Sequence, residues 1–288
     1  MLAKHLAALQ VVAEDGITYN LYNGQNPADL MFLDGAGMAE VRRITQRTPL
    51  QNGVVDKGFR LEPRKMTLAL FVNQQTERDA DIMRDKLAYI FGPTITALQL
   101  KATRLDGTVR AIDCFVDGVL DFPQSDRMGA SQKILVPLVA PDPTFYDPTR
   151  QSVTTSLSTG TGNISVPSAG LTADEWPVFE VTGPITSLRI QHSPVADLLD
   201  IVGAIPSGET WEFDLRPTYK TLKRMSDGAN RLNFLATGTI RYYSTLRLLG
   251  DKLTKSYNQT ANAFTVTGTS TTGASQIVMR YYKRYLSL

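Results

Sequence analysis

Only one stretch of the 288 residues has the apolar spacing of an α-helix, and this scarcity constrains the fold more than any other feature. A capping-box pattern opens the stretch at Thr76, and Gly92 and Pro93 end it. Its apolar residues recur at intervals of three and four: Ala80, Met83, Leu87 and Ile90. The stripe predicts an amphipathic helix over 77–91 that packs one face on a sheet, with Arg84 on the other side.

Most of the remaining sequence has the two-residue alternation of half-buried β-strands. In 211–216 every second residue is apolar, and the residues between them are charged. Apolar runs at 66–72 and 134–139 have strand length, and Asp-Gly pairs between such runs predict turns. The composition, 42% apolar and 20% charged, is typical of globular proteins. The sequence therefore predicts a mainly β fold with one helix.

Proline and small polar residues predict two domains. Pro141, Pro143 and Pro148 punctuate the end of a first domain, residues 1–148. Ser, Thr or Gly occupies 12 of the 20 positions from 151 to 170, so we expect 149–172 to be a linker or exposed edge strands. Short strands, abundant Thr and no second helix predict a β-sandwich over 173–288.

Charge and motif content argue against catalysis. The net charge is only +2, and the residues before position 145 carry 16 basic and 17 acidic side chains. The single cysteine, Cys114, lies in an apolar strand-like run, and the two histidines, His5 and His192, lie in different predicted domains. The sequence has neither a phosphate-binding glycine loop nor a nucleophile elbow. We therefore expect no enzyme, no cofactor and no catalytic or metal site.

Three features of the sequence leave other interpretations open. Asp174 and Glu175 are a possible glycosidase pair, but adjacent residues on a strand point to opposite sides and cannot flank one bond. Trp176 beside them is a candidate platform for stacking a sugar, although packing against the core is the more frequent role of such a residue. The basic cluster of Arg42, Arg43 and Arg47 suits a protein interface or, less well, a nucleic-acid contact.

Five short segments, in this order, resemble the distal tail proteins of siphophages. Thr48–Gly53 followed by Gly58–Lys65 resembles the N-terminal half of that family. Residues 138–147 resemble the end of its first domain, 176–185 the opening of the second, and 280–286 its final segment. The resemblance covers nearly the whole chain, and it rests on the order and spacing of the segments.

The resemblance implies an N-terminal split β-barrel with one helix, related to tail-tube proteins, and a galectin-like or carbohydrate-module-like sandwich. It also implies a virion protein, synthesised in the host cytoplasm and not in a membrane, that forms a homo-hexameric ring between the tail tube protein and the tail-tip hub protein. Double-stranded DNA would pass through the ring, without tight binding given the near-neutral first domain. The alternatives are another tail tube or hub subunit, or a carbohydrate-binding module for receptor recognition.

In this family the segment at about 44–65 corresponds to a long β-hairpin that reaches the neighbouring subunit. Asn52 and Gly53 supply the turn chemistry. The candidate intersubunit contacts are Arg47, Leu50, Gln51, Asn52, Val54, Val55, Asp56 and Lys57. A neighbour that covers strand edges protects them from aggregation, and a ring closes only at a fixed rotation between subunits. The hairpin geometry would therefore set the number of subunits.

Overall fold

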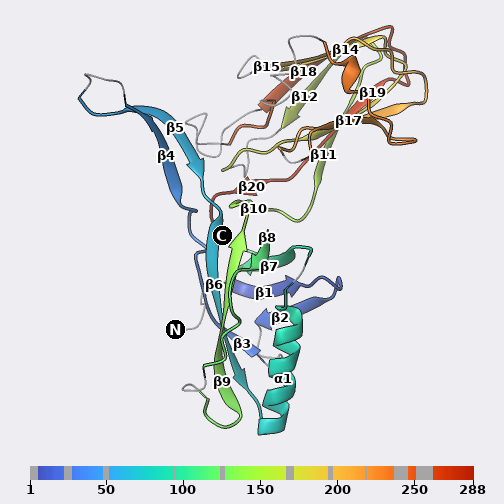
Figure 1. The fold of residues 1–288 in the computed structure, drawn as a ribbon. Coiled ribbons are helices and arrows are strands. Elements are labelled where there is room, and N and C mark those ends of the chain that lie inside the picture. Colours follow the sequence, from blue (N-terminus) through green and yellow to red (C-terminus); the bar gives the residue numbers. More distant parts are fainter. Residues whose placement is uncertain are drawn as a thin grey trace. The chain divides into compact units, whose positions relative to one another are not determined.

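The computed structural model describes most of the chain and divides it into two compact units (Figure 1). The described residues are 6–22, 28–47, 52–93, 95–123, 127–166, 172–193, 197–217, 219–236, 246–250 and 262–288. The first unit comprises Met1–Pro148 and Leu286–Leu288, and the second comprises Thr149–Tyr285. The division differs from the expected boundaries in that the last three residues cluster with the first unit. Strands dominate both units, which confirms the expected mainly β fold class.

In the first unit, antiparallel strands pair in the order β2-β1-β7-β8-β9-β6-β3. Their bounds are β1 (Leu6–Val12), β2 (Thr18–Tyr22), β3 (Ala28–Asp34), β6 (Arg64–Asn73), β7 (Leu98–Arg104), β8 (Val109–Val116) and β9 (Ser131–Ala140). The short strand β10 (Phe145–Tyr146) also pairs with β8. Within the described residues this row of strands is open at β2 and β3, so it is a curved sheet and not a closed barrel.

The helix α1 (Glu77–Ile90) forms as predicted and is the only α-helix in the described part of the chain. The Thr76 side chain accepts a hydrogen bond from the Asp79 backbone N–H at 3.1 Å, which satisfies one of the free donors of the first turn. The four residues of the predicted stripe are all buried: Ala80, Met83, Leu87 and Ile90. Because β6 and β9 alternate buried and less buried residues, the sheet offers this stripe an apolar face.

Arg84 departs from the expected solvent-facing position. Its side chain is only 12% exposed, and its Nε donates a hydrogen bond to Gln132 Oε1 on β9 at 2.5 Å. Gln132 is itself buried and donates to the carbonyl of Pro123 at 3.0 Å. The helix therefore contacts the sheet through a polar network as well as through its apolar stripe, since a buried amide needs such partners.

The second unit contains two antiparallel sheets. One has the order β11-β19-β13-β16-β17 and the other β12-β18-β14-β15. Their strands are β11 (Gln151–Ser156), β12 (Thr161–Val166), β13 (Val178–Thr182), β14 (Ser187–His192), β15 (Asp197–Ile201), β16 (Thr210–Asp214), β17 (Thr221–Arg224), β18 (Asn262–Thr269) and β19 (Gln276–Tyr281). A 3-10 turn spans Leu232–Phe234, and the short strand β20 spans Arg284–Tyr285. The Ser/Thr-rich segment forms β11 and β12, and each is an edge strand of its sheet.

One hydrophobic core joins the two sheets of the second unit. Phe179 on β13 and Phe264 on β18 are fully buried and meet edge to face, with ring centroids 5.6 Å apart. Trp211 and Phe213, from the alternating segment 211–216, belong to the same core. Side chains from opposing sheets therefore interdigitate, which is how a two-layer β structure buries its inner faces.

Candidate assembly interface

Strands β4 (Val41–Gln46) and β5 (Val55–Leu61) form a two-stranded hairpin that pairs with no other described strand. In Figure 1 it projects from the sheet of the first unit as a narrow ribbon. Its residues are exposed at nearly every position on both faces. An isolated two-stranded hairpin is only marginally stable in water. This hairpin would therefore gain stability from contact with a second surface.

The hairpin carries large apolar side chains in solvent-exposed positions. The exposed fractions are 48% for Ile44, 58% for Val54, 37% for Val55 and 52% for Phe59. Ile44 lies opposite Gly58, and Phe59 lies opposite the adjacent residue Arg43, so Ile44 and Phe59 point to different faces. Apolar surface on both faces of a thin ribbon is typical of a segment that a partner covers.

The arginines of the hairpin are paired with carboxylates at its surface. Arg43 Nη1 lies 2.9 Å from Asp56 Oδ2, and the Arg43 guanidinium lies 5.9 Å from the centre of the Phe59 ring. Glu62 accepts from Arg60 at 2.9 Å and lies 3.8 Å from Arg42. Such exposed pairs contribute little to stability, but they reduce the positive charge that the cluster presents to a phosphate backbone.

The structure places most of the predicted contact residues on the outer half of this hairpin. Arg47, Asn52, Val54, Val55, Asp56 and Lys57 are exposed, whereas Leu50 and Gln51 lie outside the described residues. A β-bulge interrupts the pairing, since Gly58 opposes Ile44 but Asp56 opposes Thr45. Gly58 has a φ of +121°, and its N–H donates to Asp56 Oδ1 at 3.0 Å. Lys57 is the extra residue of the bulge.

The paired strands extend over Val41–Leu61, whereas the sequence predicted an arm over about 44–65. Arg64 and Lys65 belong to β6 in the main sheet, and Arg64 is buried. The residues that the sequence did not single out are Ile44 and Phe59. Their exposed apolar side chains within a charged segment were the available indication.

The other candidate residues have structural partners. Trp176 is half-buried and packs against the core of the second unit, and its Nε1 atom is buried. This position does not favour an exposed platform for stacking a sugar. Asp174 Oδ2 accepts from Arg247 Nε at 2.8 Å. Glu175 is buried and paired with Arg284, as a buried charge requires. Both carboxylates of the candidate pair are therefore engaged with arginines and are not free for glycoside hydrolysis.

Cys114 and His192 are likewise part of the packing. Burial raises the pKa of the Cys114 thiol to about 12, with a smaller effect from the charge of Asp113, so the thiol is not poised as a nucleophile. His192 stacks on Phe264 at 4.5 Å, and its Nε2 lies 3.0 Å from Asn262 Oδ1. The described residues contain no group of three or more His, Cys, Asp or Glu side chains that could hold a metal ion.

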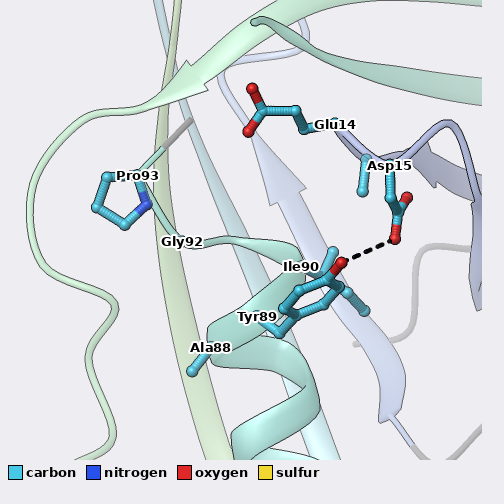
Figure 2. Close-up of a pocket in the computed structure, with 8 residues that line it drawn as sticks. Glu14, Asp15, Ala88, Tyr89, Ile90, Gly92 and Pro93 are labelled. Atoms are coloured by element: carbon cyan, nitrogen blue, oxygen red, sulfur yellow. Dashed lines mark hydrogen bonds between the residues drawn. The ribbon is translucent and has the colours of Figure 1, made fainter. Parts of the chain in front are cut away.

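A surface hollow lies at the C-terminal end of α1, beside the turn between β1 and β2 (Figure 2). It is lined by Ala13, Glu14, Asp15, Ala88, Tyr89, Ile90, Gly92 and Pro93. Asp15 Oδ2 accepts hydrogen bonds from the Tyr19 hydroxyl at 3.0 Å and the Tyr89 hydroxyl at 3.4 Å. The Asp15 carboxylate, although exposed, therefore has two hydroxyl partners within the first unit. No helix in the described part of the chain is both long enough and apolar enough to cross a membrane.

Comparison with known proteins agrees with this geometry. Residues 19–140, which include the hairpin and α1, match the phage tail protein RIFT-related domain. The resemblance to siphophage tail proteins is confirmed. No curated protein sequence matches the chain significantly. The family match therefore concerns the first unit.

Solved structures of phage tail components share the fold of the whole chain. The Dit protein (gp 19.1) of phage SPP1 has a TM-score of 0.67 at 12% identity, over 96% of this chain and 99% of that chain. Structures of the phage P2 baseplate in its activated conformation give TM-scores of 0.50 with Ca and 0.51 with Sr. Each is 6% identical and covers 98% of this chain and 99% of that chain. The similarity to these structures therefore covers the second unit as well as the first.

Proposed function

We propose that the protein is a structural, non-enzymatic component of a phage tail tip. In this proposal six copies form a ring that joins the tail tube protein to the tail-tip hub protein, and the ring becomes part of the virion. The fold is shared with SPP1 Dit, which is described as a paradigm of the hub adsorption apparatus in phages that infect Gram-positive bacteria. The phage tail domain match over residues 19–140 points to the same role.

The observation that carries the proposal is the β4–β5 hairpin. It is a ribbon with exposed apolar side chains on both faces and no partner strand in the described part of its own chain. We propose that it is an arm that lies on the neighbouring subunit, with contacts at Arg47, Leu50, Gln51, Asn52, Val54, Val55, Asp56 and Lys57. Because each arm reaches forward to the next copy, the interface is heterologous, and six such steps close a ring.

Negative-stain imaging of the purified protein tests this proposal, with light scattering as the measure of mass. We expect six-fold rings with a central opening. Stacked tubes would instead favour a tail tube subunit, which the same domain match allows. A particle that stays monomeric at every concentration would contradict the ring.

We further propose that double-stranded DNA passes through the opening without tight binding. The residues before position 145 are nearly neutral, and Arg42 and Arg43 are close to Glu62 and Asp56. In a gel-shift series, we expect no retained DNA at about 0.15 M salt, because few phosphates are neutralised. Tight binding with a steep salt dependence, lost when Arg42, Arg43 and Arg47 are replaced, would contradict this expectation.

A further inference from the structure

Arg64 lies buried at the base of the hairpin, where four backbone carbonyls surround its guanidinium. Its Nε donates to Pro143 O at 2.8 Å, and its Nη1 donates to Gly35 O at 2.8 Å and to Gly37 O. Its Nη2 donates to Leu286 O at 2.8 Å. Only 2% of the residue is exposed, so these carbonyls replace the water that a guanidinium would otherwise hold.

The carbonyl partners lie on three segments that meet at the hairpin base. Gly35 and Gly37 precede β4, Pro143 follows β9, and Leu286 lies in the final segment that clusters with the first unit. Arg64 itself opens β6, just after the hairpin ends at Leu61. Its side chain therefore connects the chain before the hairpin with the chain after it.

Gly35 shows how closely these two parts of the chain approach. A Cβ atom at this position would lie 2.2 Å from the backbone oxygen of Lys65, the residue after Arg64, and the φ of Gly35 is +78°. Only glycine fits both the contact and the left-handed conformation. Next to the last strand pair, Val41 and Leu61, the Glu62 N–H donates to Glu40 O at 2.9 Å. This bond extends the pairing of β4 and β5 by one residue toward the hairpin base.

The final segment, Leu286–Leu288, contacts the same region through its backbone. Besides the Arg64 bond to Leu286 O, Arg110 Nη1 donates to Ser287 O at 2.5 Å. The Leu288 N–H donates to Ala36 O at 3.0 Å, between the two glycines that Arg64 holds. Three successive residues of the final segment are thus fixed to the hairpin base or to β8.

We infer that Arg64 and the segment Leu286–Leu288 together form a clamp that fixes the base of the β4–β5 hairpin. The hairpin pairs with no other strand in the described part of the chain, so its order depends on how firmly its two ends are joined. Leu286 O accepts the hydrogen bond from Nη2 of the guanidinium, and Ala36 O accepts one from the Leu288 N–H. Removing the segment leaves a donor of a buried charged group unsatisfied and frees the chain before β4.

The electrostatics of the site agree with this role. Burial lowers the pKa of the Arg64 guanidinium. Its Cζ atom lies over the Phe145 ring, 4.7 Å from the ring centre. Arginine remains charged in such a place because its pKa starts far above neutrality. A lysine at position 64 would keep the charge, but its single ammonium cannot reach carbonyls on three segments in the geometry of a planar fork.

Hydrogen exchange of the 288-residue chain tests the clamp, and it is measured at peptides that cover β4 and β5. Deleting residues 286–288 is expected to speed exchange of the hairpin amides about tenfold or more, while amides of β7 and β8 change by less than about twofold. Arg64→Lys should act in the same direction. The matched control replaces Leu286, Ser287 and Leu288 together by alanine. It should leave exchange within about twofold of the wild type, because the contacts run through backbone atoms.

Two further outcomes bear on the inference. Unchanged hairpin exchange in the deletion would overturn it, as would equal acceleration in the alanine control. If the deletion does not fold, Arg110→Met removes the bond to Ser287 O and leaves the Arg64 bond to Leu286 O in place, so it should produce a smaller acceleration in the same peptides. The importance of the clamp for assembly rests on the proposed ring function. Exchange is compared at concentrations where light scattering gives equal mass for all variants, so a failed clamp is distinguishable from a failed ring.

Discussion

A variant that lacks residues 50–57 is expected to stay monomeric at concentrations where the wild-type chain forms rings. The deletion removes Val54 and Val55, which are exposed and apolar, together with the Asp56 carboxylate that pairs with Arg43. Both units should remain folded, because the described residues of this segment, 52–57, are exposed and belong to neither core. Light scattering coupled to gel filtration measures the mass. A variant that assembles as the wild type does would show that the hairpin is not the intersubunit arm.

A matched pair of point substitutions separates the arm from a general effect of surface charge. Ile44 on the hairpin and Ile82 on α1 are 48% and 56% exposed, so Asp replaces the same side chain at a similar exposure. If Ile44 is buried in the interface, Ile44→Asp should weaken each subunit contact by about 3 kcal/mol, on the order of a hundredfold. Ile82→Asp should leave assembly unchanged. Equal effects at the two sites would contradict the assignment.

The elements that the sequence predicted correctly are those in which one face is buried. The stripe of α1 arises because half of its side chains face a core and half face water. In β16, Trp211 and Phe213 face the core as the alternation predicted, whereas Asp214 between the apolar positions is buried as well. The hairpin offers no such pattern, since Val41–Gln46 and Val55–Leu61 are exposed on both faces. It was found only through the resemblance to siphophage proteins, and its ends were placed several residues too far along the chain.

Arg64 illustrates what local sequence does not reveal. It follows Glu62 and Pro63 in a charged segment that looks solvent-exposed, and arginine is seldom fully buried. Its acceptors lie 29, 79 and 222 positions away at Gly35, Pro143 and Leu286. Arg84 was misplaced for the same reason, because its partner Gln132 is 48 positions distant. Polar contacts between distant segments leave no periodicity to detect.

Phe179→Ala is expected to destabilise the second unit by about 3–5 kcal/mol while the first unit keeps its stability. Phe179 is fully buried and bridges the two sheets through Phe264, so the substitution leaves a cavity at the centre of that core. At a urea dependence of about 2 kcal/mol per molar, the midpoint should fall by about 1.5–2.5 M. Such a local loss follows if the two units fold as separate domains, which we propose from the division of the chain.

Two probes separate the units in this experiment. Both tryptophans, Trp176 and Trp211, lie in the second unit, so fluorescence follows that unit alone. Hydrogen exchange of β6 and β9 amides follows the first unit. The reciprocal variant, Leu70→Ala in the fully buried part of β6, should accelerate exchange there and leave the fluorescence midpoint in place. Coincident shifts of both probes in both variants would mean that the chain unfolds as one cooperative body, and the two-domain organisation would be wrong.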